Sequence, residues 1–308
     1  MSRVNNLLSQ LQKYKNIKLP QKVKIVEMGP RDGLQNEKII VESENKVKFI
    51  NLLSQCGFQA IETTSFVSKK WVPQMGDASE VYQKIDKVPN VSYPVLVPNV
   101  TGLDQALKVD VKEIAVFGAA SEAFSQKNIN CSISDSLKRF NEVVIKAQQN
   151  GIKIRGYVSC VMGCPYEGDI NPLKVAEVTQ KLFEMGCYEV SLGDTIGVGT
   201  PEKTKDLMQA LSQFDFQKLA VHFHDTYDRA IPNILVALEH GIQVVDSSVS
   251  GLGGCPYAGK PSGNVATETV VNTLNYLGIE TGIDKEKLKE ASDFICGLLN
   301  RQNISINF

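Results

Sequence analysis

Residues 219–225 hold two of the three histidines of the chain, His222 and His224. The apolar residues 219–223 predict a buried strand, and side chains two positions apart on a strand lie on the same face. The two imidazoles should therefore project together from the end of this strand, which is a geometry suited to a metal ion. A hydrogen-bonded pair of structural histidines is an equally good interpretation of this segment alone.

Other polar residues of the chain also follow, or end, short apolar runs. They are Arg31 and Asp32 after residues 23–27, Glu62 within residues 60–64, Asp194 after residues 189–192, and a glycine-rich stretch leading to Asn264 after residues 244–249. Each has a structural alternative: an ion pair for Arg31 and Asp32, a buried salt bridge for Glu62, a helix cap for Asp194, and a tight turn for the glycines. What they share is a position at the end of a predicted strand.

Short strand-like runs alternate with longer helical patterns from residue 23 onward. The predicted strands are 23–27, 60–64, 92–97, 113–117, 154–159, 189–192, 218–223 and 244–249. The predicted helices are 42–56, 78–85, 102–107, 134–149, 173–185, 201–211, 227–240, 266–277 and 284–300. Eight strands, each followed by a helix, predict an α/β protein with a single (β/α)8 TIM barrel. Residues 284–300 are then an additional C-terminal helix.

An open doubly wound sheet with a small second domain is the alternative arrangement. Neither a Gly-x-Gly-x-x-Gly motif after the first strand nor a Walker A lysine loop occurs, which disfavours its nucleotide-binding versions. We predict one catalytic barrel at residues 23–308. A polar extension at residues 1–22 should pack on it through Leu7, Leu8 and Leu11. Catalytic groups of such barrels gather at the C-terminal ends of the strands, where all the polar residues above fall.

Three segments resemble the hydroxymethylglutaryl-CoA lyase family, part of a wider group of metal-dependent TIM-barrel lyases and Claisen-type synthases. They are residues 27–37 (EMGPRDGLQNE), the predicted strand with residues 219–225, and the glycine-rich loop at residues 251–264. The likeness runs over residues 23–301 in the same order, and the loop around Cys255 is its most discriminating part. One departure is Gly259-Lys260-Pro261, where a proline stiffens the approach to Asn264.

The resemblance implies two groups of site residues. The metal ligands would be Asp32, His222, His224 and Asn264. The catalytic residues would be Cys255, Arg31, Asp194, Glu62 and Glu268, with Arg31 also binding the substrate. The third histidine, His240, lies in a predicted helix and is interpreted as structural.

The implied reaction is the cleavage of 3-hydroxy-3-methylglutaryl-CoA to acetyl-CoA and acetoacetate, as in leucine degradation and ketone-body formation. Two imidazoles with carboxylate and amide oxygens lack thiolates, which disfavours a closed structural zinc site and favours one Mg²⁺ or Mn²⁺ ion. Arg31 would stabilise the enolate that leaves. His222, or a relay through Asp194, would take the hydroxyl proton. Cys255 on a mobile loop would return a proton to the acetyl carbon.

Composition excludes several other classes of protein. A net charge of −1, with no basic cluster interleaved with aromatic residues, argues against nucleic-acid binding. No apolar run approaches the ~20 residues of a membrane span, and the N-terminus lacks a signal core. The seven cysteines are widely scattered and are expected to be reduced, so we predict a cytoplasmic enzyme. The family suggests a homodimer acting on a CoA-thioester substrate.

Two rival functions share part of this pattern. A synthase or aldolase of the wider group would keep the same metal ligands, but Cys255 lies in a loop that resembles the lyases. A barrel that binds CoA thioesters without catalysis is the other rival. It is disfavoured because every metal and catalytic position is filled.

Overall fold

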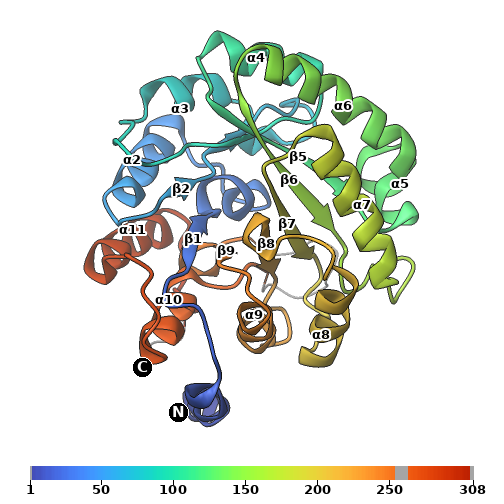
Figure 1. The fold of residues 1–308 in the computed structure, drawn as a ribbon. Helices are drawn as coiled ribbons and strands as arrows, with labels where there is room; N and C mark the ends of the chain where they lie inside the picture. Colours follow the sequence, from blue (N-terminus) through green and yellow to red (C-terminus); the bar gives the residue numbers. More distant parts are fainter. Residues whose placement is uncertain (1, 254–262, 306–308) are drawn as a thin grey trace.

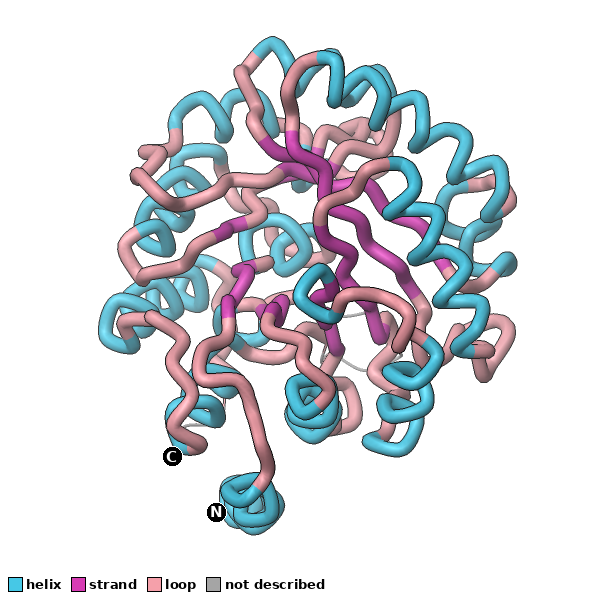
Figure 2. The backbone as a smooth tube through the Cα atoms, in the orientation of Figure 1, coloured by secondary structure: helices cyan, strands magenta, loops and turns pink. Residues whose placement is uncertain are grey.

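The computed structural model describes residues 2–253 and 263–305, and over these ranges the strands form one closed parallel barrel wrapped by helices (Figures 1 and 2). The strands are β1 (Lys24–Glu27), β2 (Ala60–Ile61), β3 (Thr64–Ser65), β4 (Val95–Leu96), β5 (Glu113–Ala119), β6 (Lys153–Ser159), β7 (Glu189–Asp194), β8 (Leu219–Phe223) and β9 (Val244–Ser247). Their order in the sheet is β2-β1-β9-β8-β7-β6-β5-β4-β3. The predicted TIM barrel is confirmed.

The barrel closes through the predicted strand at residues 60–64, which is divided into β2 and β3. Between them the backbone N–H of Glu62 donates to Glu27 O at 2.9 Å, and that of Thr63 donates to Pro94 O at 3.0 Å. At β2 the polypeptide thus pairs with β1 and, through Ala60, with Ser92, and at β3 it pairs with β4. Because these bonds continue the pairing across the break, the short strands occupy one of the eight barrel positions.

The helices cover the outside of the sheet (Figure 1). They are α1 (Ser2–Leu11), α2 (Ser43–Ser54), α3 (Ala78–Lys84), α4 (Val100–Lys108), α5 (Glu122–Ile129), α6 (Ile133–Gln149), α7 (Pro172–Met185), α8 (Pro201–Ala210), α9 (Ala230–Glu239), α10 (Thr267–Tyr276) and α11 (Lys285–Leu298). Helix α5 was not predicted from the sequence; Ser121 caps its first turn by accepting the backbone N–H of Phe124 at 3.0 Å. The predicted additional C-terminal helix is α11.

The N-terminal helix α1 packs through its apolar side chains. Leu7 and Leu11 are buried, and just beyond the helix the Nε2 of Gln12 donates to Tyr276 Oη at 3.1 Å. The division into an extension at residues 1–22 and a barrel at residues 23–308 stays a prediction. Within the described ranges, no helix is both long and apolar enough to cross a membrane.

Two apolar layers flank the sheet. The larger one lies between strands and helices and includes Phe49, Leu53 and Leu182. The smaller one, separate from it, contains small side chains such as Ala60, Ala115 and Ala220 together with Tyr157. Small side chains leave room inside a barrel, and polar side chains occupy this room.

Candidate active site

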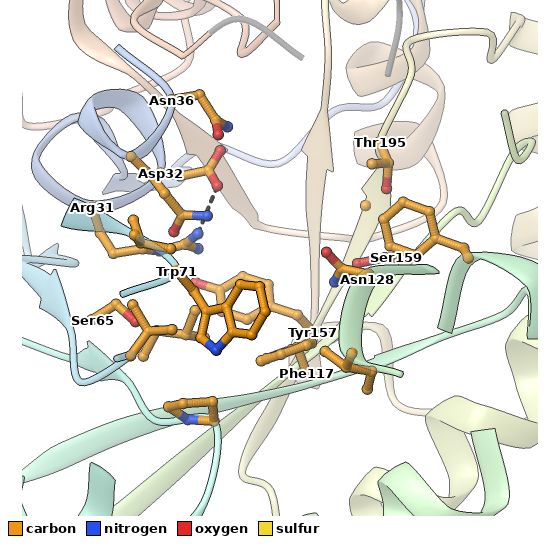
Figure 3. Close-up of a pocket in the computed structure, with 18 of the residues that line it drawn as sticks. Arg31, Asp32, Asn36, Ser65, Trp71, Phe117, Asn128, Tyr157, Ser159 and Thr195 are labelled. Carbon is orange, nitrogen blue, oxygen red and sulfur yellow. Dashed lines mark hydrogen bonds and ion pairs between the residues drawn. The ribbon is translucent and has the colours of Figure 1, made fainter. Parts of the chain in front are cut away.

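A cavity of about 780 Å³ opens among the loops that follow the strands. Its wall includes the predicted residues Arg31, Asp32, His222 and His224. Figure 3 shows Arg31 and Asp32 on the same side as the indole of Trp71, facing Asn128 and Thr195 across the cavity. The structure therefore brings the predicted substrate-binding arginine and three predicted metal ligands into one site.

Asp32, His222 and His224 form a candidate metal centre. Each offers one ligand atom, and these atoms all lie within 4.8 Å of one another. His222 lies on β8 and His224 directly after it, while Asp32 lies in a π-helical turn, Gly29–Gly33, after β1. Within the described residues, the buried Nδ1 of His224 has no hydrogen-bond partner, as expected for an atom that binds a cation. The residues present thus fit a divalent metal ion.

The protonation states of Asp32 and His224 favour cation binding. Burial raises the pKa of Asp32, but Arg31, His222 and His224 together outweigh burial and hold this pKa well below its usual range. Burial and the neighbouring His222 lower the pKa of His224 to about 4. At neutral pH Asp32 is therefore a carboxylate and His224 a neutral imidazole, the forms that coordinate metal ions. Burial lowers the pKa of His222, but the hydrogen bonds and charges of Asp246 and Asp32 outweigh burial and raise it to about 9, so a metal ion must displace a proton from His222.

Asn264 lies beside this centre. Its Nδ2 donates to Asp32 Oδ2 at 2.7 Å, and its backbone pairs with that of His224. A half-turn of the Asn264 side-chain amide would point its oxygen, in place of its nitrogen, toward the candidate metal centre, since the two ends of the amide have the same shape. That Asn264 is a metal ligand stays a prediction.

A buried ionic chain begins at Arg31. The guanidinium donates from Nη1 to Asp32 Oδ1 at 2.6 Å and from Nε to Glu62 Oε1. Glu62 is fully buried between β2 and β3, and its Oε2 accepts the hydroxyl of Tyr157 on β6. Glu62 thus forms the buried salt bridge that its position in the sequence allows, and its part in catalysis stays a prediction. Glu62 fixes Arg31 from behind, and its contact with Tyr157 extends the chain into the barrel.

The buried ionic chain of side chains continues across the barrel interior and returns to the metal centre. Tyr157 Oη accepts Arg155 Nη1 at 2.8 Å, and Arg155 binds both oxygens of Asp246 on β9 at 2.8 and 3.0 Å. Asp246 Oδ2 lies 3.2 Å from His222 Nδ1, and His222 Nε2 lies 3.6 Å from Asp32 Oδ2. We call this closed set the ionic ring: Asp32, Arg31, Glu62, Tyr157, Arg155, Asp246 and His222.

Arg155, Tyr157 and Asp246 were missed by the sequence analysis. A signal was present, because Arg155 and Tyr157 alternate within an apolar strand and must share a face. Asp246 likewise interrupts the apolar run of β9. Charged residues at inward positions of apolar strands are expensive to bury and therefore need partners.

Asp246 should set the orientation of the His222 ring. Carboxylates that bind the far nitrogen of a metal-ligating histidine typically change metal affinity ~10- to 100-fold when mutated. We therefore expect Asp246→Asn to weaken Mn²⁺ binding by about that factor, measured from the electron paramagnetic resonance signal of free Mn²⁺. Glu189→Gln is the matched control, since Glu189 binds Arg155 Nε at 2.7 Å without contacting His222. Equal affinities in Asp246→Asn and the native protein would contradict this role.

Asp194 and Glu268 are not brought to the metal centre. Asp194 accepts the backbone N–H of Val198 at 3.2 Å and of Gly199 at 2.8 Å, which anchors the turn after β7. Glu268 accepts the backbone N–H of Ser250 at 2.9 Å and thus supports the loop after β9. Neither is among the described residues that line the cavity. Their part in catalysis stays a prediction, and their contacts are those of loop supports.

Cys255 and the Gly259-Lys260-Pro261 departure lie outside the described residues. The chain on either side of this segment does reach the site. Gly253 belongs to the cavity wall, and the backbone N–H of Asn264 donates to Gly253 O at 3.2 Å. The catalytic assignment of Cys255 stays a prediction.

The family model described as HMGL-like matches residues 22–295. The chain belongs to the HMGL-like family. Mitochondrial hydroxymethylglutaryl-CoA lyase of Homo sapiens is 59% identical over 288 residues, which cover 93% of this chain and 89% of the human protein. Cytoplasmic 3-hydroxy-3-methylglutaryl-CoA lyase of Rattus norvegicus is 58% identical over 284 residues, covering 92% of this chain and 83% of the rat protein.

Solved structures agree with this membership. Hydroxymethylglutaryl-CoA lyase from Pseudomonas aeruginosa superposes with a TM-score of 0.91 at 55% identity, covering 93% of this chain and 96% of that one. An HMG-CoA lyase from Acinetobacter baumannii, solved in complex with coenzyme A and 3-methylmalate, has a TM-score of 0.88 at 34% identity, with 92% and 93% covered. The family predicted from the sequence is confirmed.

Proposed function

We propose that this protein is a hydroxymethylglutaryl-CoA lyase, which cleaves 3-hydroxy-3-methylglutaryl-CoA to acetyl-CoA and acetoacetate. The observation that carries this proposal is the Asp32, His222 and His224 centre beside the Arg31 guanidinium in one cavity. Family membership at 59% identity to the human lyase supports it. The carbon–carbon bond that breaks lies between the thioester's C2 and the carbon bearing the hydroxyl.

The residues of the cavity divide the work of this reaction. A bound Mg²⁺ or Mn²⁺ supplies Lewis acidity to the substrate hydroxyl. Asp32, His222, His224 and Asn264 would hold this ion. Arg31 keeps a fixed positive charge where the enolate oxygen develops, and Glu62 fixes its direction. Asp194 is poorly placed to take the hydroxyl proton, because both its oxygens accept backbone N–H groups behind the cavity wall.

We also propose where the coenzyme A portion lies. The cavity wall extends from Arg31 past Trp71 to Lys127 and Arg139. The Trp71 indole is 77% exposed and offers an apolar face to a pantetheine chain, while Lys127 and Arg139 offer cations to phosphates. The complex of the Acinetobacter baumannii relative with coenzyme A supports a CoA-thioester substrate.

A homodimer and a cytoplasmic location complete the proposal. The homodimer is supported by the family resemblance. For the location, the names of the relatives include both a mitochondrial and a cytoplasmic lyase, and the cytoplasmic relative supports this part of the proposal.

Acetoacetate production from 3-hydroxy-3-methylglutaryl-CoA tests the function directly. We expect turnover by the purified protein, its loss after treatment with a chelator, and recovery on addition of Mg²⁺ or Mn²⁺. His222→Ala should stay folded but inactive, because it removes one ligand from the centre. Full activity after exhaustive metal removal would contradict the metal centre. Condensation of acetyl-CoA with a 2-oxo acid, in the absence of cleavage, would favour the synthase.

A further inference from the structure

Glu27, the last residue of β1, is a fully buried carboxyl group that the reaction above does not use. Its Oε1 accepts the backbone N–H of Gly29 at 2.7 Å and of Val249 at 2.9 Å. Its Oε2 accepts the hydroxyl of Thr267 at 2.7 Å. The Glu27 side chain therefore joins the turn that directly follows it in the sequence to two segments near the other end of the protein.

Each of these segments carries part of the site. Gly29 begins the turn that holds Arg31 and Asp32. Val249 begins the 3-10 turn Val249–Gly251, which ends two residues before Gly253 in the cavity wall. Thr267 is the first residue of α10 and comes three residues after Asn264. Glu27 itself is not among the described residues of the cavity wall, so any effect on the reaction must pass through these segments.

The fit around Glu27 is close. A Cβ atom at Gly29 would lie 2.7 Å from Glu27 Oε1, so a side chain there would force the carboxyl group to shift. The turn with Arg31 and Asp32 can therefore approach the undisturbed carboxyl group this closely because residue 29 is glycine. The Thr267 hydroxyl, which binds Glu27 Oε2, also lies 2.8 Å from the hydroxyl of Ser247. Thr267 and Ser247 thus form a short hydroxyl chain that begins at Oε2.

We infer that Glu27 is a positioning residue for the lyase reaction, which holds the Arg31–Asp32 turn against the loop after β9. This inference rests on the proposed function. The carboxyl group acts as a clamp between the two loops, with α10 as its third support. Without it, the turn loses its bond at Gly29 and the loop after β9 loses its bond at Val249.

The hydroxyl chain predicts which replacement the clamp tolerates. Burial raises the pKa of Glu27 to about 8, so the group carries its proton at neutral pH. Protonation reverses the direction of the bond to Thr267: the acid donates from Oε2 to the Thr267 hydroxyl, which then donates to Ser247. The amide of glutamine reproduces this pattern, because its oxygen accepts the two backbone N–H groups and its nitrogen donates to Thr267.

The test compares Glu27→Gln with Glu27→Met in the full-length protein. Because a displacement of ~1 Å at a reacting group can cost about 10²-fold, we expect Glu27→Met to lower kcat at least ~10-fold. Mn²⁺ binding, followed by paramagnetic resonance without substrate, should weaken at least ~10-fold because Asp32 moves with the turn. Glu27→Gln should restore both values to within about threefold of the native protein, as a matched hydrogen-bonding group should.

Two further variants separate positioning from general stability. Glu113→Met removes another buried carboxyl group, which binds Tyr188 Oη at 2.6 Å from the first residue of β5. It should lower the melting temperature but leave kcat and Mn²⁺ affinity unchanged. Gly29→Ala disturbs the clamp from the other side. If Glu27→Met does not fold, Gly29→Ala takes its place and should show the losses of kcat and of Mn²⁺ affinity expected for Glu27→Met.

Native kcat and native Mn²⁺ affinity in Glu27→Met or Gly29→Ala would overturn the inference. Equal losses in Glu113→Met would also overturn it, since the effect would then reflect stability alone. If the native protein does not cleave 3-hydroxy-3-methylglutaryl-CoA, the proposed function fails. The Mn²⁺ titrations then still decide whether Glu27 places Asp32.

Discussion

Replacement of Arg31 by methionine should lower kcat by at least ~10²-fold, since one preorganised donor to a developing charge contributes roughly 3 kcal/mol. Methionine matches the unbranched stem of arginine as far as Nε but lacks the cationic guanidinium group that faces the departing enolate. Steady-state kinetics with 3-hydroxy-3-methylglutaryl-CoA measure the effect. A raised KM with an unchanged kcat would show that Arg31 only anchors the substrate.

A control is needed because Arg31 also neutralises Glu62, which is fully buried. Removing one partner of a buried ion pair typically costs about 3–5 kcal/mol of stability. Arg31→Met should therefore unfold at a lower denaturant concentration than the native protein. The double variant Arg31→Met/Glu62→Gln removes both charges and should regain stability while kcat stays low. Recovery of kcat in the double variant would contradict the electrostatic role.

Cys255→Ser should slow cleavage by at least ~10²-fold while the protein still binds metal and substrate, because a positioned proton donor typically contributes 10²–10⁴-fold. A hydroxyl has nearly the shape of a thiol but a pKa several units higher, so it transfers a proton poorly near pH 7. Single-turnover measurements of acetoacetate formation isolate this step. Native rates in Cys255→Ser would show that the thiol does not carry the proton.

Alkylation gives an independent test of Cys255. Among the other cysteines, Cys56, Cys160, Cys164, Cys187 and Cys296 are buried, and only Cys131 is partly exposed. Burial raises the pKa of the Cys56 and Cys187 thiols to about 12, which suppresses their reactivity. Inactivation should therefore persist in Cys131→Ser and disappear in Cys255→Ser. Bound substrate should protect the native protein.

The sequence predicted the barrel well because its signals are local. Each apolar run and each glycine at a helix end is readable within a few residues, as at Gly186, which ends α7 with φ 106°. The break between β2 and β3 was not predicted, because the pattern at residues 60–64 stays suitable for a strand. The pairing on either side of the break is revealed only by the closed sheet: β2 pairs with β1 and, through Ala60, with Ser92, whereas β3 pairs with β4.

The metal centre was predictable for a similar reason. His222 and His224 are neighbours in the sequence, and Asp32 follows a strand end, where a parallel barrel collects side chains. The rest of the ionic ring depends on long-range pairing: Arg155 and Asp246 are 91 positions apart. Each of these charges is visible within an apolar strand, but a local pattern does not show which distant residue pairs with it.

The placement of the ionic ring limits how this protein can be redesigned. Loop exchange is the usual route to a new reaction in this fold, because loops supply most catalytic groups. Here Arg155, Tyr157, His222 and Asp246 lie on β6, β8 and β9, so grafted loops would inherit them unchanged. New loops could select a different thioester. A different type of chemistry would require redesigning the barrel interior, where every charge removed leaves a partner unpaired.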